Sequence, residues 1–286
     1  MTDSLEARIA QAVAQALRTY VGVDGLGVRS NRLKLQLAQG DYVVGIVVTI
    51  PSPTVAELLA RVGFDFLWLD LEHGPTGLET AQTMIAAIEG THATPLIRVA
   101  WNDPALIKRA LDTGPHGIIV PMVSSAEEAE KAVCACKYPP QGIRGAGISR
   151  AQRYGLELDA YLRRANEEIM VIVQIEDPAG LEAVDEIAGV EGIDVIFVGP
   201  FDLSGSMGIL GQLEHPRVQE AMDRVARTCA EHGVVAGTLA SDPEKVNREF
   251  RRGFRYVAMG VDVAHMINCA QGLLSQVQRA SSSLHR

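Results

Sequence analysis

The amino-acid sequence predicts an α/β protein whose main domain is a (β/α)₈ barrel, and three observations lead to this fold. Strand-like and helix-like segments alternate eight times along the chain of 286 residues. No Gly-x-Gly-x-x-Gly turn follows the first strand-like run, which argues against the competing architecture, a doubly wound open sheet. Ionisable residues directly follow several strand-like runs, and catalytic groups of a barrel come from the carboxyl ends of its strands.

The predicted strands are apolar runs that are bounded by turn residues and are too short to be helices. They cover Tyr42–Thr49, Phe66–Asp70, Pro95–Val99, Gly117–Pro121, Ile169–Ile175, Asp194–Val198, Val234–Thr238 and Tyr256–Met259. Several of the predicted helices follow residues that are typical of helix N-termini, such as Ser52-Pro53. They cover Thr54–Val62, Leu78–Ile88, Pro104–Leu111, Ala126–Cys136, Asp159–Glu167, Leu181–Ala188, Pro216–His232 and Pro243–Arg251, and a last helix follows Asp262.

The two ends of the chain lie outside this alternation. Apolar residues recur every four positions from Leu5 to Leu17, which predicts an amphipathic helix over residues 3–19 that is followed by a linker. We therefore divide the chain into an N-terminal helical extension (1–30), the barrel domain (31–275) and a flexible tail (276–286).

Composition excludes several classes of protein. A net charge of −9 argues against nucleic acid or an anionic membrane as the main partner. No apolar run reaches the roughly 18 residues that a membrane-spanning helix needs, and the acidic start lacks the apolar core of a signal peptide. The four cysteines follow no metal-binding or disulfide pattern, so we expect reduced thiols and a cytoplasmic protein.

Two carboxylates follow neighbouring predicted strands and could bind one divalent cation. Glu176 follows the fifth strand and Asp202 the sixth. Two protein oxygens leave room for substrate and water, which suits Mg²⁺ or Mn²⁺ rather than a closed zinc site. The alternative is that one of these carboxylates pairs with Arg98 or caps a helix.

The other residues at the carboxyl ends of the predicted strands, which together form the rim of the barrel, also have two interpretations each. Arg98, after the third strand, could capture an anionic substrate or pair internally with Asp70 or Glu72. His73, after the second strand, could do acid–base work, with Asp70 or Asp112 as the acid that would orient its ring, or it could be a structural histidine. The segment 199–208 could present backbone N–H groups to an anion or form a tight turn with a capped helix. No lysine ends a predicted strand, which argues against a Schiff-base mechanism.

These segments together resemble the HpcH/HpaI family, the metal-dependent class II pyruvate aldolases that act on 2,4-dihydroxyhept-2-ene-1,7-dioate and 2-dehydro-3-deoxyglucarate. The resemblance extends over about residues 40–275. The motifs that carry it are Gly63-Phe64-Asp65, Asp70-Leu71-Glu72-His73-Gly74-Pro75, Pro95-Leu96-Ile97-Arg98, Val120-Pro121-Met122-Val123, Tyr138-Pro139-Pro140-Gln141-Gly142-Ile143-Arg144-Gly145, Gln174-Ile175-Glu176 and Gly199-Pro200-Phe201-Asp202-Leu203-Ser204.

The resemblance implies reversible cleavage of a 4-hydroxy-2-oxo acid to pyruvate and an aldehyde, with Mg²⁺, Mn²⁺ or Co²⁺ as cofactor. It also implies a TIM barrel whose last helix packs against a neighbouring subunit, within a hexamer that is a trimer of dimers. The implied metal ligands are Glu176 and Asp202, and Arg98 would contact the substrate near its keto oxygen. His73, supported by Asp112 or Asp70, would handle the proton of the aldol hydroxyl.

The remaining implied contacts are with the substrate. Gln174 would line the pyruvate pocket, and backbone N–H groups around Phe201 and Asp202 would hold the carboxylate. Leu239 would help to shape the aldehyde side of the pocket, together with Val47, Phe201 and Trp101.

The chain departs from the family pattern in its pocket walls. Gly45-Ile46-Val47-Val48 stands where relatives often carry a tryptophan, and Phe201 is bulkier than the small residue common at that position. These departures concern the identity of the substrate. Two alternative functions are a lyase of CoA thioesters of citramalyl or malyl type and a non-catalytic barrel that binds an α-keto acid.

Overall fold

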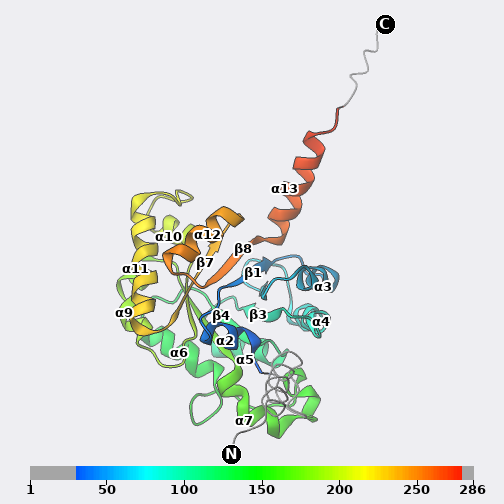
Figure 1. Ribbon diagram of the computed structural model, residues 1–286. Helices are drawn as coiled ribbons and strands as arrows, with labels where there is room; N and C mark the ends of the chain where they lie inside the picture. Colours follow the sequence, from blue (N-terminus) through cyan, green and yellow to red (C-terminus); the bar gives the residue numbers. More distant parts are fainter. Residues whose placement is uncertain (1–29, 279–286) are drawn as a thin grey trace, which may run out of the picture.

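The computed structural model of the protein describes residues 30–278. It shows a closed barrel of eight parallel strands that is surrounded by helices (Figure 1). The strands neighbour one another in chain order, and β8 closes the barrel against β1. They are β1 (Val43–Val48), β2 (Phe66–Asp70), β3 (Thr94–Arg98), β4 (Gly117–Val120), β5 (Met170–Ile175), β6 (Val195–Val198), β7 (Val235–Ala240) and β8 (Tyr256–Val261). The predicted fold class is confirmed.

Most of the surrounding helices lie where the sequence predicts them, with ends that differ by no more than one residue. Five of these begin with a proline or follow a Ser or Asp whose side chain caps a backbone N–H. They are α3 (Pro53–Val62), α4 (Leu78–Ile88), α5 (Pro104–Asp112), α6 (Ala126–Cys136), α7 (Leu158–Glu168), α11 (Pro216–His232) and α12 (Pro243–Arg252).

The helical segment between β5 and β6 differs from the prediction of one helix over Leu181–Ala188. It forms two short helices, α8 (Pro178–Glu182) and α9 (Val184–Ala188), which are separated at Ala183. The first helix starts earlier than predicted because the carboxylate of Asp177 accepts a hydrogen bond from Gly180 N. Two further elements were not predicted, the 3₁₀ helix η1 (Arg150–Gly155) and α2 (Arg32–Ala38).

Helix α2 closes the end of the barrel at which the strands begin. Leu33 and Leu37 are buried against the residues of the barrel interior, and Asn31 caps the helix. The amide of Asn31 also donates hydrogen bonds to the carbonyl oxygens of His116 and Glu168, next to the starts of β4 and β5. Within residues 30–278, α2 therefore covers the starts of the strands, whereas their carboxyl ends are not covered in this way.

Alternate residues of each strand face the barrel interior, which is filled by large side chains. Phe66 stacks on Tyr256 with ring centroids 4.1 Å apart, and Trp68 meets Phe197 edge-on at 4.9 Å. The residues between them in sequence, such as Leu67 and Ile196, face outward and pack under the helices. Because side chains alternate between the two faces of a strand, only every second residue can reach a site at the open end of the barrel.

Helix α13 (Asp262–Ser275) projects away from the barrel (Figure 1). Its start is fastened to β1, because the buried carboxylate of Asp262 accepts hydrogen bonds from the backbone N–H groups of Thr49 and Ile50. Beyond this point the helix exposes large apolar side chains, namely Met266, Ile267, Leu273 and Leu274. A helix with such a face normally buries it against a partner.

The predicted helix over residues 3–19 and most of the predicted tail over 276–286 lie outside the described residues. Between residues 30 and 278, none of the helices is both long and apolar enough to cross a lipid bilayer.

Gly45 provides a test of the interior packing. A Cβ atom at Gly45 would lie 2.2 Å from the ring of Phe66, so Gly45→Ala forces the stacked rings apart and should lower the free energy of unfolding by about 1–3 kcal/mol. Chemical denaturation measures the change. Gly147→Ala, where a Cβ atom meets nothing within 4 Å, is the control. The cost should shrink in a Phe66→Leu background, and an equal cost in both backgrounds would contradict the steric explanation.

Candidate active site

The inward-facing positions of the strands change from apolar to polar at the open end of the barrel. On β2, Phe66 and Trp68 are followed two residues later by Asp70, and Arg98 is the paired residue on β3. The guanidinium of Arg98 lies over the ring of Trp68, with its Cζ 4.9 Å from the ring centroid. The polar site therefore lies next to the aromatic side chains that fill the barrel interior.

Arg98 is bound by two carboxylates from the same rim. Its Nε and Nη2 donate hydrogen bonds to the two oxygens of Asp70, at 2.9 and 2.6 Å. Its Nη1 also forms an ion pair with Oε2 of Glu72, at 2.9 Å. The internal pairing considered for Arg98 in the sequence is thus present. Burial is almost complete for Asp70 and Arg98.

Glu176 follows β5 and is held by uncharged groups. The backbone N–H of Met122, just after β4, donates a hydrogen bond to Oε2 at 3.1 Å, and Nε2 of Gln174 donates to Oε1 at 3.0 Å. Gly199 allows this arrangement, because a Cβ atom there would stand 2.9 Å from Oε1. Neither of these donors neutralises the charge of the carboxylate.

Asp202 stands in the first turn of a short helix, α10 (Pro200–Ser206), which begins directly after β6 and Gly199. Segment 199–208 therefore contains a short helix without a side-chain cap, which departs from the capped helix of the second interpretation and is compatible with the first. Phe201 and Asp202 are exposed, whereas the next two residues are buried. Asp202 acts electrostatically on both Glu72 and Glu176, so the three carboxylates share one region of the rim.

The electrostatics of the rim favour binding of a cation. Burial, together with the charges of Glu72 and Asp202, raises the pKa of Glu176 to about 7. Burial is also the main cause that raises the pKa of Glu72, with Asp70 and Asp202 adding to the effect against Arg98 and His73. Four carboxylates thus share this end of the barrel with one guanidinium, and the uncompensated charge is unfavourable where the carboxylates are buried, as at Glu176.

These residues fit a divalent metal ion of the hard type. Carboxylate oxygens are the ligands that Mg²⁺ and Mn²⁺ prefer, and among the described residues the carboxylate of Glu176 accepts its hydrogen bonds from uncharged donors. Over residues 30–278, no three His, Cys, Asp or Glu side chains gather closely enough to hold a metal by themselves. A metal here would therefore depend on two protein carboxylates together with substrate and water, as the sequence suggested.

The ring of His73 is oriented differently from the prediction. Neither Asp70 nor Asp112 contacts it, and its nearest acid is Glu72, whose Oε2 lies 3.7 Å from Nε2. Asp70 is not available because both of its oxygens are bound by Arg98, and only the backbone N–H of His73 contacts it, at 3.4 Å. The imidazole itself is 64% exposed at the mouth of the barrel.

Asp112 belongs to the opposite end of the barrel in this chain. It is the last residue of α5, a helix that starts near the end of β3 and runs back toward the start of β4. There its carboxylate accepts a hydrogen bond from Arg144, which is buried against the rings of Tyr138 and Tyr161. Within one chain Asp112 therefore does not reach His73, and its carboxylate contacts Arg144 instead.

The residues expected in the pocket wall occupy two environments. Leu239 on β7 and Val47 on β1 face inward and contact the interior of the barrel. Phe201 and Trp101 are more than half exposed at the mouth. Gln174 faces inward as expected, but its amide donates to Glu176 and its Oε1 is buried without a partner.

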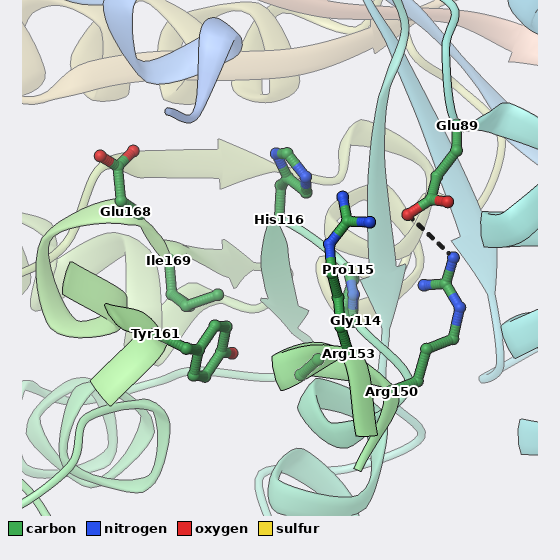
Figure 2. Close-up of a pocket in the computed structure, with 10 residues that line it drawn as sticks. Glu89, Gly114, Pro115, His116, Arg150, Arg153, Tyr161, Glu168 and Ile169 are labelled. Atoms are coloured by element: carbon green, nitrogen blue, oxygen red, sulfur yellow. Dashed lines mark ion pairs between the residues drawn. The ribbon is translucent and has the colours of Figure 1, made fainter. Parts of the chain in front are cut away.

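A separate cavity of about 70 Å³ lies at the other end of the barrel, near the starts of β4 and β5 (Figure 2). An ion pair between Arg150 and Glu89, 3.0 Å long, lies in its wall. None of the residues predicted to be functional lines this cavity.

Met122 is the contributor that the sequence analysis missed. It acts through its backbone N–H, so its residue type carries no signal of this contact. Its position at the end of β4 was the one available indication, because the ends of neighbouring strands meet at the rim.

Comparison with known proteins agrees with this site. The model of the HpcH/HpaI aldolase/citrate lyase family matches residues 44–269. A 4-hydroxy-2-oxo-heptane-1,7-dioate aldolase of Shigella flexneri is 39% identical over 88% of this chain and 95% of its own length. A 5-keto-4-deoxy-D-glucarate aldolase of Shigella boydii is 38% identical, over 88% of this chain and 98% of its own length.

A solved structure supports the same assignment. An HpcH/HpaI aldolase/citrate lyase family protein of Burkholderia cenocepacia is 34% identical, and it superposes with a TM-score of 0.84 over 87% of this chain and all of its own. The chain therefore belongs to the HpcH/HpaI aldolase/citrate lyase family, and it is a carbon–carbon lyase of the aldolase type.

Proposed function

We propose that the enzyme reversibly cleaves a 4-hydroxy-2-oxo acid to pyruvate and an aldehyde at the carboxyl end of its barrel. The observation that carries this proposal is the group of acids around Arg98, with Glu176 and Asp202 at the side of the rim away from β2 and β3. Relatives are named for 4-hydroxy-2-oxo-heptane-1,7-dioate and 5-keto-4-deoxy-D-glucarate, so we propose an acyclic oxo acid of this kind as substrate.

Glu176 and Asp202 are the proposed ligands of a divalent cation, Mg²⁺, Mn²⁺ or Co²⁺. When bound, such a cation acts as a Lewis acid that stabilises negative charge on the keto oxygen of the substrate. Arg98 lies beside the same region and supplies a second positive charge, held in place by Asp70 and Glu72. Backbone N–H groups of Phe201 and Asp202, in the first turn of α10, are proposed to hold the carboxylate of the substrate.

His73 is proposed to move the proton of the aldol hydroxyl. In the cleavage direction, the imidazole, directly or through water, accepts the proton of the C4 hydroxyl while the bond between C3 and C4 breaks. The bonding electrons pass to C3 as the pyruvate enolate, which is then protonated to pyruvate. Its exposed position lets His73 approach the aldehyde half of the substrate, on the side that Leu239 and Phe201 help to shape.

The two alternative functions have less support. The segments that join each strand to the following helix contain no Lys or Arg throughout residues 30–278, and neither does α10. The phosphates of a CoA thioester would find no cation there beyond Arg98. A barrel that only binds keto acids would not need the acidic rim, yet Glu176, Asp202 and His73 all stand at it.

We also propose that the enzyme is a cytoplasmic homo-oligomer, a hexamer built as a trimer of dimers, in which α13 packs against a neighbouring subunit. Support comes from the exposed apolar side chains of α13, which the barrel of the same chain leaves uncovered. The four cysteines are free thiols, in keeping with a reducing compartment.

Metal binding should depend on pH through Glu176. Because its pKa is raised to about 7, the carboxyl is protonated below that pH and must lose its proton before a cation binds. Mn²⁺ affinity should therefore fall by about tenfold per pH unit as the pH drops below about 7. Titration calorimetry of the chelator-treated protein between pH 5.5 and 8 measures this, and Glu176→Gln should bind no Mn²⁺ and lose turnover. Full activity of the chelator-treated enzyme would disprove the metal proposal.

Replacement of His73 should slow cleavage without preventing enolisation. His73→Ala should lower kcat for pyruvate release by on the order of 10²–10⁴, because the hydroxyl proton loses its acceptor. Exchange of the methyl protons of pyruvate for deuterium, followed by NMR, requires no C4 hydroxyl and should be much less affected. An equal loss in both assays would show that His73 does not act on the hydroxyl.

The apolar face of α13 should control assembly. Ile267→Asp, which places a charge on this face, should convert the oligomer to smaller species in light scattering while the barrel keeps its thermal stability. Cys269, exposed on the same helix, should react slowly with a thiol reagent in the wild-type oligomer and rapidly in the variant. A wild-type protein that is monomeric at micromolar concentration would refute the proposal.

A further inference from the structure

We propose that Met122 and Gln174 form a two-point clamp that orients the carboxylate of Glu176 without neutralising it. Each oxygen of Glu176 accepts one hydrogen bond from the clamp, 3.1 Å from Met122 N and 3.0 Å from Gln174 Nε2. The backbone donor follows the end of β4 and the side-chain donor lies on the neighbouring β5, so the carboxylate is fixed relative to both strands. This inference rests on the proposed function in that Glu176 is taken to be a metal ligand.

The backbone of Met122 adopts an unusual conformation at the point where its N–H meets Glu176. Its φ is 54°, in the left-handed region that L-residues with a side chain seldom adopt. The side chain is 37% exposed and therefore does not impose the conformation through burial. The next residue, Val123, donates its N–H to the carbonyl of Gln174 at 2.9 Å, which holds the turned segment against β5. The turn directs the N–H of Met122 toward Glu176.

Gln174 is a polar residue among apolar ones, at an inward position that is 1% exposed. Its amide is oriented by Glu176, because the reversed amide would bring Oε1 against the carboxylate. In the observed orientation Oε1 is buried without a hydrogen-bond partner, which is unfavourable. An unpaired oxygen at this position is explained if the Nε2 donor is needed at Glu176.

The uncharged nature of both donors distinguishes Glu176 from Asp70. The oxygens of Asp70 are bound by the guanidinium of Arg98, which compensates the charge. The donors at Glu176 leave its charge uncompensated and leave a free lone pair on each oxygen. Groups that orient a metal ligand in this way commonly change metal affinity by 10–100-fold when they are lost.

The test measures binding of Mn²⁺ alone, by calorimetry on chelator-treated protein, so that no turnover is involved. Gln174→Leu removes the donor and the unpaired oxygen together, so thermal stability should be kept while Mn²⁺ affinity falls about tenfold or more. Met122→Val should have the same effect, because a β-branched residue strongly disfavours positive φ and turns the N–H away.

Met122→Gly is the matched control, because it keeps the N–H, removes the side chain and adopts positive φ freely. It should bind Mn²⁺ within about twofold of wild type and melt at the same or a higher temperature. Wild-type affinity in both Gln174→Leu and Met122→Val would overturn the clamp, and so would an equal loss in Met122→Gly and Met122→Val. Wild-type protein that fails to bind Mn²⁺ would instead overturn the proposed function, and the clamp with it.

Discussion

The ion pair between Arg98 and Asp70 is the interaction on which the open end of the barrel depends. Below it the interior is filled by aromatic and aliphatic side chains, which offer no partner to a charge. Arg98 lies over Trp68 and binds both oxygens of Asp70, so its charge is compensated at the point where the apolar core ends. Removing one partner of such a buried pair costs about 3–5 kcal/mol, because the other charge is left without compensation.

The same pair also determines where negative charge remains. Arg98 shares its single charge between Asp70 and Glu72, and no other Lys or Arg of residues 30–278 forms an ion pair with Glu176 or Asp202. The hydrogen bonds that Glu176 accepts come from uncharged groups, and its pKa is raised to about 7. The rim therefore has two halves. At β2 and β3 the charge of the carboxylates is compensated by Arg98, whereas at β5 and β6 it is not, and a cation would bind at β5 and β6.

The alternation of strands and helices could be predicted from the sequence because each element shows its own period and its own boundary residues. The charged residues at the rim were equally visible, since they interrupt apolar runs at the ends of strands. The failures have one cause, which is that contacts between distant segments leave no local pattern. The sequence offers the pairing of Arg98 with Asp70 only as one of two interpretations. It does not show that the carboxylate of Asp112 contacts Arg144 or that α2 covers the starts of the strands.

The backbone contact to Glu176 could not be predicted for a further reason. Met122 contributes an N–H, which almost every residue type has, and its left-handed conformation would have been expected of Gly or Asn. Side chains that serve the site indirectly are also hard to recognise. Gln174 was correctly placed at the rim, but whether its amide faces the substrate or Glu176 depends on the neighbouring strand.

The distribution of charge also suggests how the substrate is recognised. An oxo acid brings a carboxylate into a rim that already holds four, and the loops after the strands supply no Lys or Arg. Arg98 is already engaged by Asp70 and Glu72, so its remaining attraction for another anion is reduced. The proposed cation at Glu176 and Asp202 would then supply positive charge to the substrate carboxylate, in addition to the backbone N–H groups at the start of α10. On the proposed function, the metal would therefore contribute to binding of the substrate as well as to breaking of the carbon–carbon bond.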